Sequence, residues 1–491
     1  MKSALNYPSS PPHVLIFPVP AQGHVNSMLK LAELLSISGI HVTFLNTDRS
    51  QELLTRFTDV QARFTNKYPG FKFLTITDGL DHDSPVLDPV MAMFDSMKLK
   101  SKPVFKKMLT DIRPEVDCVI GDGILGFIAE TCFEVGVPVI HFRTVSACCF
   151  WACFNMPDMI EAGELPIRGE EDMDRLITKV PGMETFLRCR DLPSYCRKTD
   201  VNDPLIRMVI EATMQCRQVH ALIFNTFEEL EGDTLSQIRN HCPKIFSIGP
   251  LHELLNVKLN TQETQQYSLN SLSEIDRSCM TWLDGQETGS VIYVSFGSNT
   301  SITKEQVTEI WHGIANSKTR FLWVIRPGSV TDKNDGSKDD DSVDKISREL
   351  QEGGPKENGY VVKWAPQEEV LGHKAIGGFL THNGWNSTLE SIVAGVPMIC
   401  WPNFVDQLVN SRFVSEIWKI GLDMKDVCDR KIVEKMVNDL MVNKRDEFVK
   451  SSSRMAELAR KSVSEGGSSW SNLDRLIEEI RVISRQGDHH D

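Results

Sequence analysis

Residues 364–407 read WAPQEEVLGHKAIGGFLTHNGWNSTLESIVAGVPMICWPNFVDQ, and the expected fold and chemistry both start from this stretch. Its turn at residues 384–387 precedes a helical run. The first turn of a helix leaves backbone N–H groups without a partner inside the helix, and such groups bind anions. Together with the side chains of His382, Asn386 and Ser387, they predict an anion site that suits a diphosphate.

Four more positions of this stretch have side chains suited to a nucleotide sugar. Trp364 offers an aromatic face for a base, and Glu390 a carboxylate for the two hydroxyls of a ribose. Asp406 and Gln407 form a hydrogen-bonding pair typical of sugar recognition. Taken singly, three of them have purely structural explanations: Trp364 as core, Glu390 as a helix surface charge and Asp406 as a turn residue. Only their combination favours a ligand site.

Outside this stretch the chain alternates short apolar runs with longer mixed segments. The runs at 13–17, 41–45 and 118–120 are separated by amphipathic segments, and the pattern restarts at 291–296 and 320–325. These runs are too continuously apolar for strands that expose one face to water. The sequence therefore predicts an α/β protein made of two doubly wound parallel halves that face each other across a cleft.

The boundaries of the halves follow from changes in composition. We expect an N-terminal domain over residues 1–250 and a polar interdomain linker over 251–275, rich in Asn, Gln, Thr and Ser. A C-terminal domain over 276–465 and a final helix over 466–491, which packs back towards the first domain, complete the expected organisation.

Two polar residues follow strands of the first half, where open α/β sheets bind ligands. His24 lies in the loop after the first strand, and Asp122 follows the strand over residues 118–120. A lone histidine at a helix start is more often structural. An adjacent carboxylate, however, orients an imidazole and stabilises its cation, so the pair predicts a general base.

Residues 121–126 offer an alternative, because GDGILG matches the G-x-G-x-x-G pattern between a strand and a helix. A dinucleotide site of this type uses an acid about 20 residues further on to hold a ribose hydroxyl. The sequence offers only Arg143 there, which leaves NADP binding as a remote alternative.

Composition limits the classes of partner. The chain has 53 basic and 67 acidic residues and a net charge of −14, which argues against binding to nucleic acid or anionic membranes. Twelve cysteines, largely within apolar runs, are expected to be buried thiols in the cytoplasm. No run approaches the length of a membrane helix, and no Cys/His spacing fits a zinc site.

The stretch 364–407 resembles the signature box of plant secondary-product UDP-glycosyltransferases. The resemblance covers nearly the whole chain, through PAQGH at 20–24, NTFEELE at 225–231, IGP at 248–250 and SFGS at 295–298. It implies the GT-B fold, with the acceptor bound by the first Rossmann-like domain and the UDP-sugar by the second. Glucose is the implied sugar because Gln407 ends the box.

The resemblance also implies residue roles. His24 would be the catalytic base and Asp122 its partner. The implied UDP-sugar site comprises Ser298, Trp364, Ala365, Gln367, His382, Trp385, Asn386, Ser387, Glu390, Asp406, Gln407 and Thr144. Ile124 and Phe150 are the expected acceptor contacts. The reaction would be a single displacement that inverts the anomeric carbon of UDP-glucose, a co-substrate, without a metal or other cofactor, in a monomer.

The acceptor is not determined by these motifs. The apolar content of the N-terminal loops favours a lipophilic molecule. The openings at residues 14–23 and 27–35 are similar to the branch that glucosylates iridoids such as 7-deoxyloganetic acid and related terpenoids. A flavonoid or other phenolic acceptor, and a protein that binds the nucleotide sugar without turning it over, remain as alternatives. Ser27, Asn383 and Gly121 depart from the residues common in the family.

Overall fold

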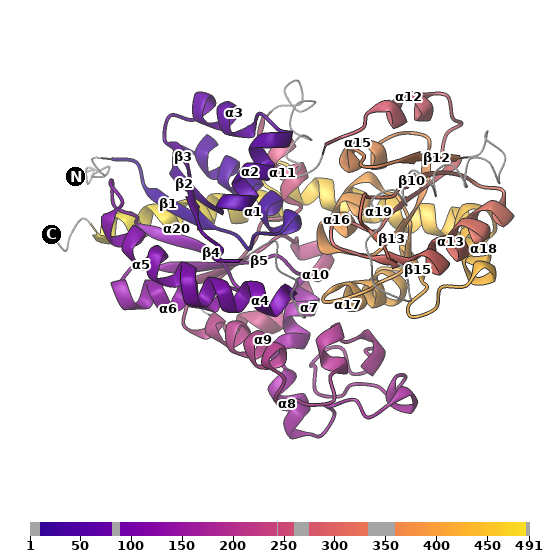
Figure 1. Ribbon diagram of the computed structural model, residues 1–491, viewed down its shortest axis with the longest axis horizontal. Helices are drawn as coiled ribbons and strands as arrows, with labels where there is room; N and C mark the ends of the chain where they lie inside the picture. Colours follow the sequence, from indigo (N-terminus) through magenta and orange to yellow (C-terminus); the bar gives the residue numbers. More distant parts are fainter. Residues whose placement is uncertain (1–9, 81–88, 243, 260–273, 332–358, 488–491) are drawn as a thin grey trace.

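The computed structural model describes residues 10–80, 89–242, 244–259, 274–331 and 359–487. The chain forms two lobes, each built around a parallel β-sheet with helices on its faces (Figure 1). The α/β class and the pair of doubly wound halves predicted from the apolar runs are confirmed.

The N-terminal sheet has seven strands in the order β3-β2-β1-β4-β5-β6-β7. Every position of β1, β4 and β5 is buried, which explains why these strands appear in the sequence as unbroken apolar runs. The strands are β1 (His13–Phe17), β2 (His41–Thr47), β3 (Phe71–Ile76), β4 (Cys118–Asp122), β5 (Val139–Arg143), β6 (Ala221–Phe224) and β7 (Ile245–Ser247).

The C-terminal sheet has six strands in the order β12-β10-β8-β13-β14-β15, and β9 and β11 form a separate pair. The bounds are β8 (Val291–Ser295), β9 (Ile302–Thr303), β10 (Arg320–Val324), β11 (Val330–Thr331), β12 (Gly359–Val362), β13 (Ile376–Thr381), β14 (Met398–Cys400) and β15 (Gly421–Asp423). All pairings in both large sheets are parallel.

The strand order places the functional loops. In each large sheet, successive strands are first added on one side of the first strand and later strands on its other side. The strand order therefore reverses between β1 and β4 in one sheet and between β8 and β13 in the other. Loops that leave the carboxyl ends of two such strands diverge and open a crevice. Asp122 is the last residue of β4, His24 lies in the first turn of the helix after β1, and Ser298 and His382 lie in the loops after β8 and β13.

The helices of the N-terminal lobe cover both faces of its sheet (Figure 1). They are α1 (Gln22–Ile37), α2 (Asp48–Phe57), α3 (Val60–Lys67), α4 (Pro89–Ser96), α5 (Lys102–Asp111), α6 (Gly126–Val135), α7 (Ala147–Phe154), α8 (Met156–Glu161), α9 (Pro204–Met214), α10 (Glu228–Arg239) and α11 (Leu251–Leu259).

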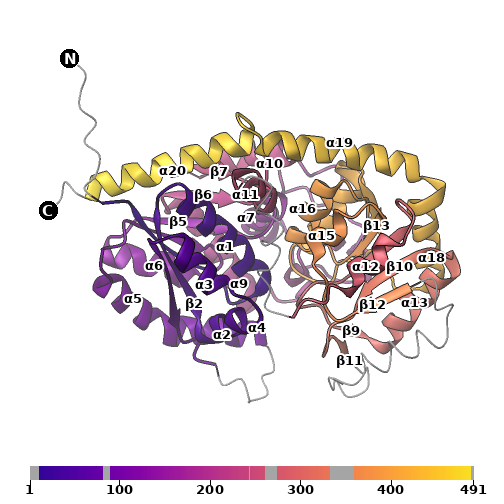
Figure 2. The same cartoon turned by 90° about the horizontal axis from the view of Figure 1, so that it is seen from above.

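In the C-terminal part, helices again alternate with strands along the chain, until α19 and α20 end it without a further strand. They are α12 (Ser278–Asp284), α13 (Lys304–Ser317), α15 (Gln367–Leu371), α16 (Trp385–Ala394), α17 (Gln407–Arg412), α18 (Arg430–Asn438), α19 (Arg445–Val463) and α20 (Ser468–Gly487). Figure 2 shows α19 and α20 running one after the other across both lobes.

Two segments concern the expected domain boundaries. Residues 251–259, which the composition places in the linker, form α11, and its Leu251, Leu254 and Leu255 are buried in the N-terminal core. The polar composition of the segment comes from residues 260–273, which lie outside the described residues. At the other end of the chain, Leu473 and Ile480 of α20 belong to the same N-terminal core.

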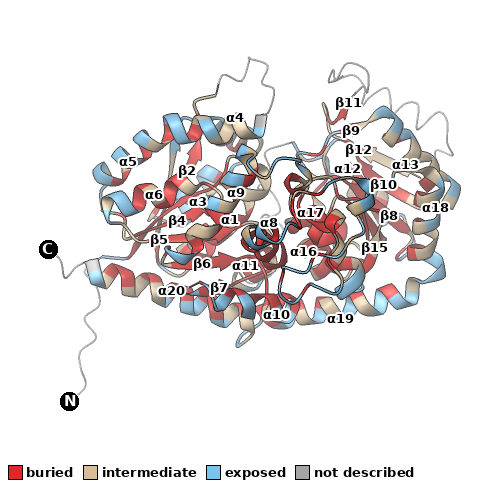
Figure 3. Ribbon diagram, turned by 90° about the horizontal axis from the view of Figure 1, so that it is seen from below, coloured by how far each residue is buried: buried red, intermediate tan, exposed pale blue. Residues whose placement is uncertain are grey.

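The core is continuous between the lobes. Figure 3 shows the strands of both sheets as the buried interior, and one apolar cluster runs from Phe17 and Phe127 to Tyr293 and Phe379. The cysteines are free thiols, and all except Cys428 are buried, as expected. Among the helices that the structure describes, none has the length and apolar character to cross a membrane.

Candidate active site

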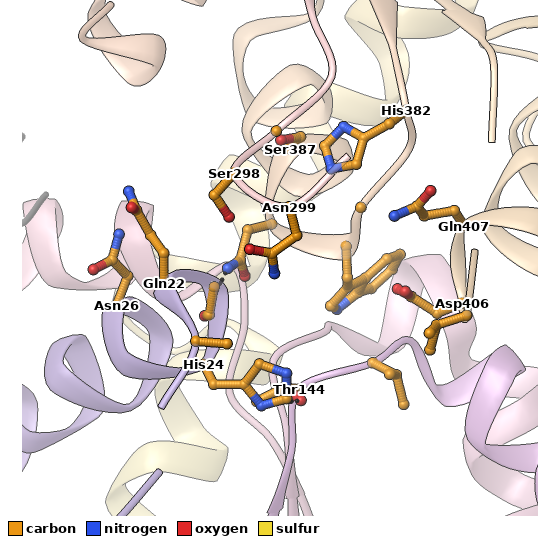
Figure 4. A pocket seen from close by; sticks show the side chains of 18 of the residues that line it. Gln22, His24, Asn26, Thr144, Ser298, Asn299, His382, Ser387, Asp406 and Gln407 are labelled. Atoms are coloured by element: carbon orange, nitrogen blue, oxygen red, sulfur yellow. Dashed lines mark hydrogen bonds between the residues drawn. The ribbon is translucent and has the colours of Figure 1, made fainter. Parts of the chain in front are cut away.

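A cavity of about 790 Å³ lies between the two lobes. The loops after β1, β4 and β5 line it from the N-terminal side, and the loops after β8, β12 and β13 line it from the C-terminal side. Figure 4 shows side chains of both lobes converging on it, with His24 and Thr144 opposite Ser298 and His382. This is the crevice that the two reversals of strand order predict.

His24 and Asp122 are in contact at the floor of the cavity. The Nδ1 of His24 lies 2.6 Å from Oδ2 of Asp122, which also accepts a hydrogen bond from the backbone N–H of Val19 at 3.3 Å. Asp122 is 1% exposed. With Nδ1 occupied by the carboxylate, Nε2 is the ring nitrogen left to take a proton from a ligand.

The contact between His24 and Asp122 shifts the pKa of both side chains. Burial disfavours the charged form of each group, but their mutual attraction outweighs it, so the pKa of His24 lies above its usual value and the pKa of Asp122 lies below. Thr144 stands beside them, with Oγ1 3.1 Å from Nδ1 of His24. Thr144 therefore lines the cavity next to His24.

The N-terminus of α16 faces the cavity from the C-terminal lobe. His382, just before this helix, is held neutral because burial and the nearby Arg326 lower its pKa to about 4. Its buried Nδ1 has no partner among the described residues. A Cβ at Gly297, where φ is +73°, or at Gly384 would lie within 2.6 Å of the His382 ring. These glycines let the ring sit against the loop.

Gln367, Ser387 and Glu390 form one hydrogen-bonded group on the C-terminal side of the cavity. The Nε2 of Gln367 donates to Oγ of Ser387 at 2.8 Å and to Oε2 of Glu390 at 2.6 Å. Burial and the neighbouring Glu368 raise the pKa of Glu390 to about 7. Trp364, Ala365 and Ser298 complete this side of the cavity.

Asp406 and Gln407 lie at the end of the cavity nearest β14. The Oε1 of Gln407 accepts hydrogen bonds from the backbone N–H groups of Asn403 and Phe404, at 2.9 and 3.1 Å. This turns its amide nitrogen towards the cavity (Figure 4). Burial raises the pKa of Asp406 to about 6.

Two residues of the expected donor site also join the lobes. The indole N–H of Trp385 donates to the backbone O of Asn225 at 2.7 Å. Asn386 accepts from Ser27 at 2.9 Å and donates to the backbone O of Gly23 at 2.9 Å. Both line the cavity, but these side-chain hydrogen bonds connect to the N-terminal lobe. Sequence spacing gives no sign of such contacts.

Of the two expected acceptor contacts, Ile124 lines the cavity and Phe150 does not. Phe150 is fully buried and packs edge-on against Phe224 in the N-terminal core. The face of α7 that reaches the cavity carries Cys149 and Cys153 instead. The prediction that Phe150 contacts the acceptor directly is therefore wrong, because this side chain lies on the face of α7 that points away from the cavity.

Sequence reasoning missed several residues of the cavity. Lys30 of α1 forms an ion pair with Glu368 of α15 across the lobes. Burial lowers the pKa of Lys30 but Glu368 and Glu390 more than compensate, so that it lies above its usual value. A group of mostly apolar residues from α4, η4 (Ser194–Arg197) and α9 was also missed: Met93, Phe94, Tyr195, Leu205, Met208 and Val209. Only their hydrophobicity hinted at such a role.

The glycines at 121–126 have a packing explanation. A Cβ at Gly121 would lie 2.7 Å from Ile128, and one at Gly123 would lie 2.7 Å from Cδ of Arg143. Asp122 between them is bonded to His24. The loop therefore needs small residues for close packing, which removes the main support for a dinucleotide site.

Comparison with known proteins gives a consistent result. The family model described as UDP-glucoronosyl and UDP-glucosyl transferase matches residues 259–453. A 7-deoxyloganetic acid glucosyl transferase of Catharanthus roseus is 53% identical, over 96% of this chain and 98% of that protein. A myricetin 3-O-rhamnoside 1,2-glucosyltransferase of Crocosmia x crocosmiiflora is 42% identical, over 96% of each. The crystal structure of Os79 from O. sativa with UDP superposes with a TM-score of 0.79 at 24% identity, covering 95% of this chain and all of that one.

Proposed function

The chain belongs to the UDP-glycosyltransferase family and has its GT-B fold, and we propose that it transfers glucose from UDP-glucose to a hydroxyl or carboxyl of a small lipophilic plant metabolite, with inversion at the anomeric carbon. The observation that carries the proposal is the His24–Asp122 pair, which lies across one cavity from the N-terminus of α16. The cavity holds a base on one wall and an anion site on the other.

The donor half of the cavity is suited to UDP-glucose. The N–H groups at the start of α16 and the side chain of His382, which lines the cavity, would hold the diphosphate. Glu390 would accept the ribose hydroxyls, and Trp364 would stack on uracil. Gln407 and Asp406 would bind the glucose hydroxyls. We assign residues 1–250 with 466–491 to acceptor binding and 276–465 to donor binding.

The proposed reaction is a single displacement. His24 takes the proton of the acceptor hydroxyl at Nε2, while Asp122 stabilises the resulting imidazolium. The acceptor oxygen forms its bond to the anomeric carbon as the bond from that carbon to the UDP oxygen breaks. The N–H groups of α16 stabilise the charge that remains on the leaving diphosphate, so none of these residue roles needs a metal ion. The product would be a β-glucoside.

The best-supported acceptor is an iridoid or related terpenoid. The N-terminal part of the cavity is lined by apolar side chains from α4 and α9, which suit a compact lipophilic molecule. The relative at 53% identity is named for 7-deoxyloganetic acid. A flavonoid or other phenolic acceptor is the second candidate, because the relative at 42% identity is named for a flavonoid rhamnoside.

The test is mass spectrometry of the products formed from UDP-glucose and a panel of iridoid, monoterpenoid, flavonoid and simple phenolic acceptors. We expect a hexose on the iridoid. A hexose on the flavonoid alone would overturn the acceptor assignment and keep the reaction. If UDP binds and no member of the panel gains a hexose, the proposed transfer to a small lipophilic acceptor fails.

A further inference from the structure

Arg143 is a buried cation in the wall of the cavity that the reaction described above does not use. It is the last residue of β5, it is 5% exposed, and its side chain lines the cavity. One guanidinium nitrogen, Nη1, donates to the backbone O of Gly123 at 2.5 Å. The guanidinium also lies 4.9 Å from the centre of the Phe150 ring. The packing of Phe150 therefore fixes the position of this cation.

The guanidinium of Arg143 has no anionic partner in the part of the chain that the structure describes. Lys425, the other buried lysine or arginine among the described residues, does have one, because it pairs with Asp191. The carboxylate of Asp122 is near enough for the charge of Arg143 to lower its pKa, but it forms no ion pair with the guanidinium and is engaged with His24 and with the N–H of Val19. Burial of an unpaired charge is costly, because the group loses its hydration without gaining a counter-charge. Such a residue is expected where a ligand brings the opposite charge.

The position of Arg143 identifies which ligand this would be. The expected diphosphate site lies at α16 in the opposite lobe, whereas Arg143 neighbours Gly123 and Ile124 on the acceptor side. It also directly precedes Thr144, whose hydroxyl lies 3.1 Å from the ring of His24. An anion bound here would belong to the same small molecule whose hydroxyl faces the base.

We propose that Arg143 binds a carboxylate of the acceptor, so that the enzyme selects hydroxy acids and glucosylates their hydroxyl group. This inference rests on the proposed function and narrows its substrate class. A guanidinium presents two parallel N–H groups to a carboxylate and binds it with defined orientation. Arg143 acts as a specificity-determining residue: it fixes the acid group, and the apolar walls orient the rest of the acceptor towards His24.

The test compares an acceptor acid with its own methyl ester, which keeps the shape and removes the charge. The acceptors are 7-deoxyloganetic acid and its methyl ester, and the variants are R143M and R143K. For R143M we expect the ratio of kcat/KM for the acid to kcat/KM for the ester to fall by at least about 30-fold, the size expected for losing a charged hydrogen bond. R143K should recover part of this ratio.

Arg445 provides a matched control outside the cavity. Its Nη1 donates to the backbone O of Gly289 at 2.9 Å, as Arg143 does to Gly123, and it does not line the cavity. R445M should leave the acid to ester ratio at the wild-type value. If R143M lowers kcat/KM for acid and ester in parallel, Arg143 only supports the Gly123 loop and the proposal is wrong.

A binding measurement separates this proposal from the proposed function. Calorimetric titration of the wild type and R143M with acid and ester, in the presence of UDP, needs no turnover. We expect the wild type to bind the acid more tightly than the ester, and R143M to lose this preference. Equal affinity of the wild type for both overturns the carboxylate site even if glucose is transferred. A preference for the acid supports the site even if no glucoside forms.

Discussion

The proposed reaction depends on the charge state of His24. The ring lies 2.6 Å from the Asp122 carboxylate and is partly open to the cavity, with 29% of its side chain exposed. A base with a raised pKa accepts a proton more strongly, but it must be neutral when the acceptor arrives. Asp122 therefore strengthens the base and also sets the lowest pH at which it works.

Replacement of His24 by alanine tests its role directly. We expect turnover in His24→Ala to fall by at least about 10²-fold, because the acceptor oxygen loses its proton acceptor. UDP affinity, measured by calorimetry, should stay near the wild-type value, since the expected diphosphate contacts lie in the other lobe. His373→Gln, which changes a histidine paired with Asp284 and not lining the cavity, is the control. Unchanged turnover in His24→Ala would exclude the base assignment.

Asp122→Asn should change the pH profile in a defined direction. The carboxylate holds the pKa of His24 above its usual value, so its removal lowers that pKa and keeps the ring neutral to lower pH. The acid limb of kcat/KM should therefore move to lower pH, while the plateau falls by at least about 10-fold because the imidazolium loses its partner. Steady-state kinetics across pH 5–9 measure both. An acid limb that stays in place would show that another group sets it.

At the scale of elements, α1, α15 and α16 bring Lys30, Glu368 and Glu390 together where the ribose is expected. The pKa of Glu390 is raised to about 7 by burial and by Glu368. The ionised carboxylate accepts hydrogen bonds from ribose hydroxyls better than the neutral acid does. The affinity of the donor half for a nucleoside should therefore depend on pH.

Uridine is the appropriate probe, because it has no phosphate that titrates near neutral pH. We expect its affinity to rise between about pH 6 and pH 8 as Glu390 loses its proton. E390Q, which cannot ionise, should bind uridine more weakly at pH 8 and show no such rise. Calorimetric titrations at three pH values measure the effect. An equal rise in E390Q would assign the titration to another group.

The sequence predicted strands better than contacts between strands. The runs that became β1, β4 and β8 were evident because buried parallel strands are apolar on both faces. The order of the strands in the sheet was not evident, because hydrogen bonding between strands that are distant in sequence leaves no local pattern. His24 and Asp122 were predicted as partners because both follow central strands. The contact between Lys30 and Glu368, separated by 338 positions, had no such signal.

The helix α7 shows a second limit of sequence reasoning. All its residues are buried, so no polar face marks its orientation. The prediction that Phe150 lines the acceptor site therefore had no basis for choosing between the two sides of the helix. The cavity is lined by Cys149 and Cys153. Likewise, the polar composition around residues 251–273 concealed that its first nine residues form a packed helix.

At the scale of the whole molecule, a buried group of charges outside the cavity lining joins the two lobes. Asp191, in the 3-10 turn Cys189–Asp191 of the N-terminal lobe, is 0% exposed. Its carboxylate lies 2.9 Å from Arg188 of the same lobe and 2.9 Å from Lys425 of the other. Burial raises the pKa of Asp191, but Lys425 and Arg188 outweigh it, so that the pKa lies below its usual value.

Removal of Lys425 should destabilise the contact between the lobes. We expect Lys425→Met to lower the free energy of unfolding by about 1.5–3 kcal/mol, because the buried Asp191 carboxylate loses one charged partner and keeps Arg188 and Arg412. Lys435→Met, which breaks an exposed pair with Asp439 within one helix, should cost less than about 0.5 kcal/mol. Denaturant titration measures both. Equal stability of the two variants would contradict the interpretation.

The position of α20 affects the design of hybrid proteins that combine the N-terminal half of one family member with the C-terminal half of another. The apolar face of this helix is part of the N-terminal core, although it follows the C-terminal sheet in the chain. A hybrid made with a single crossover in residues 260–273 would join one protein's β7 and α11 to another protein's α20. A transplanted donor half should fit better with two crossovers, the second between α19 and α20, so that the last helix is inherited with the acceptor half it completes.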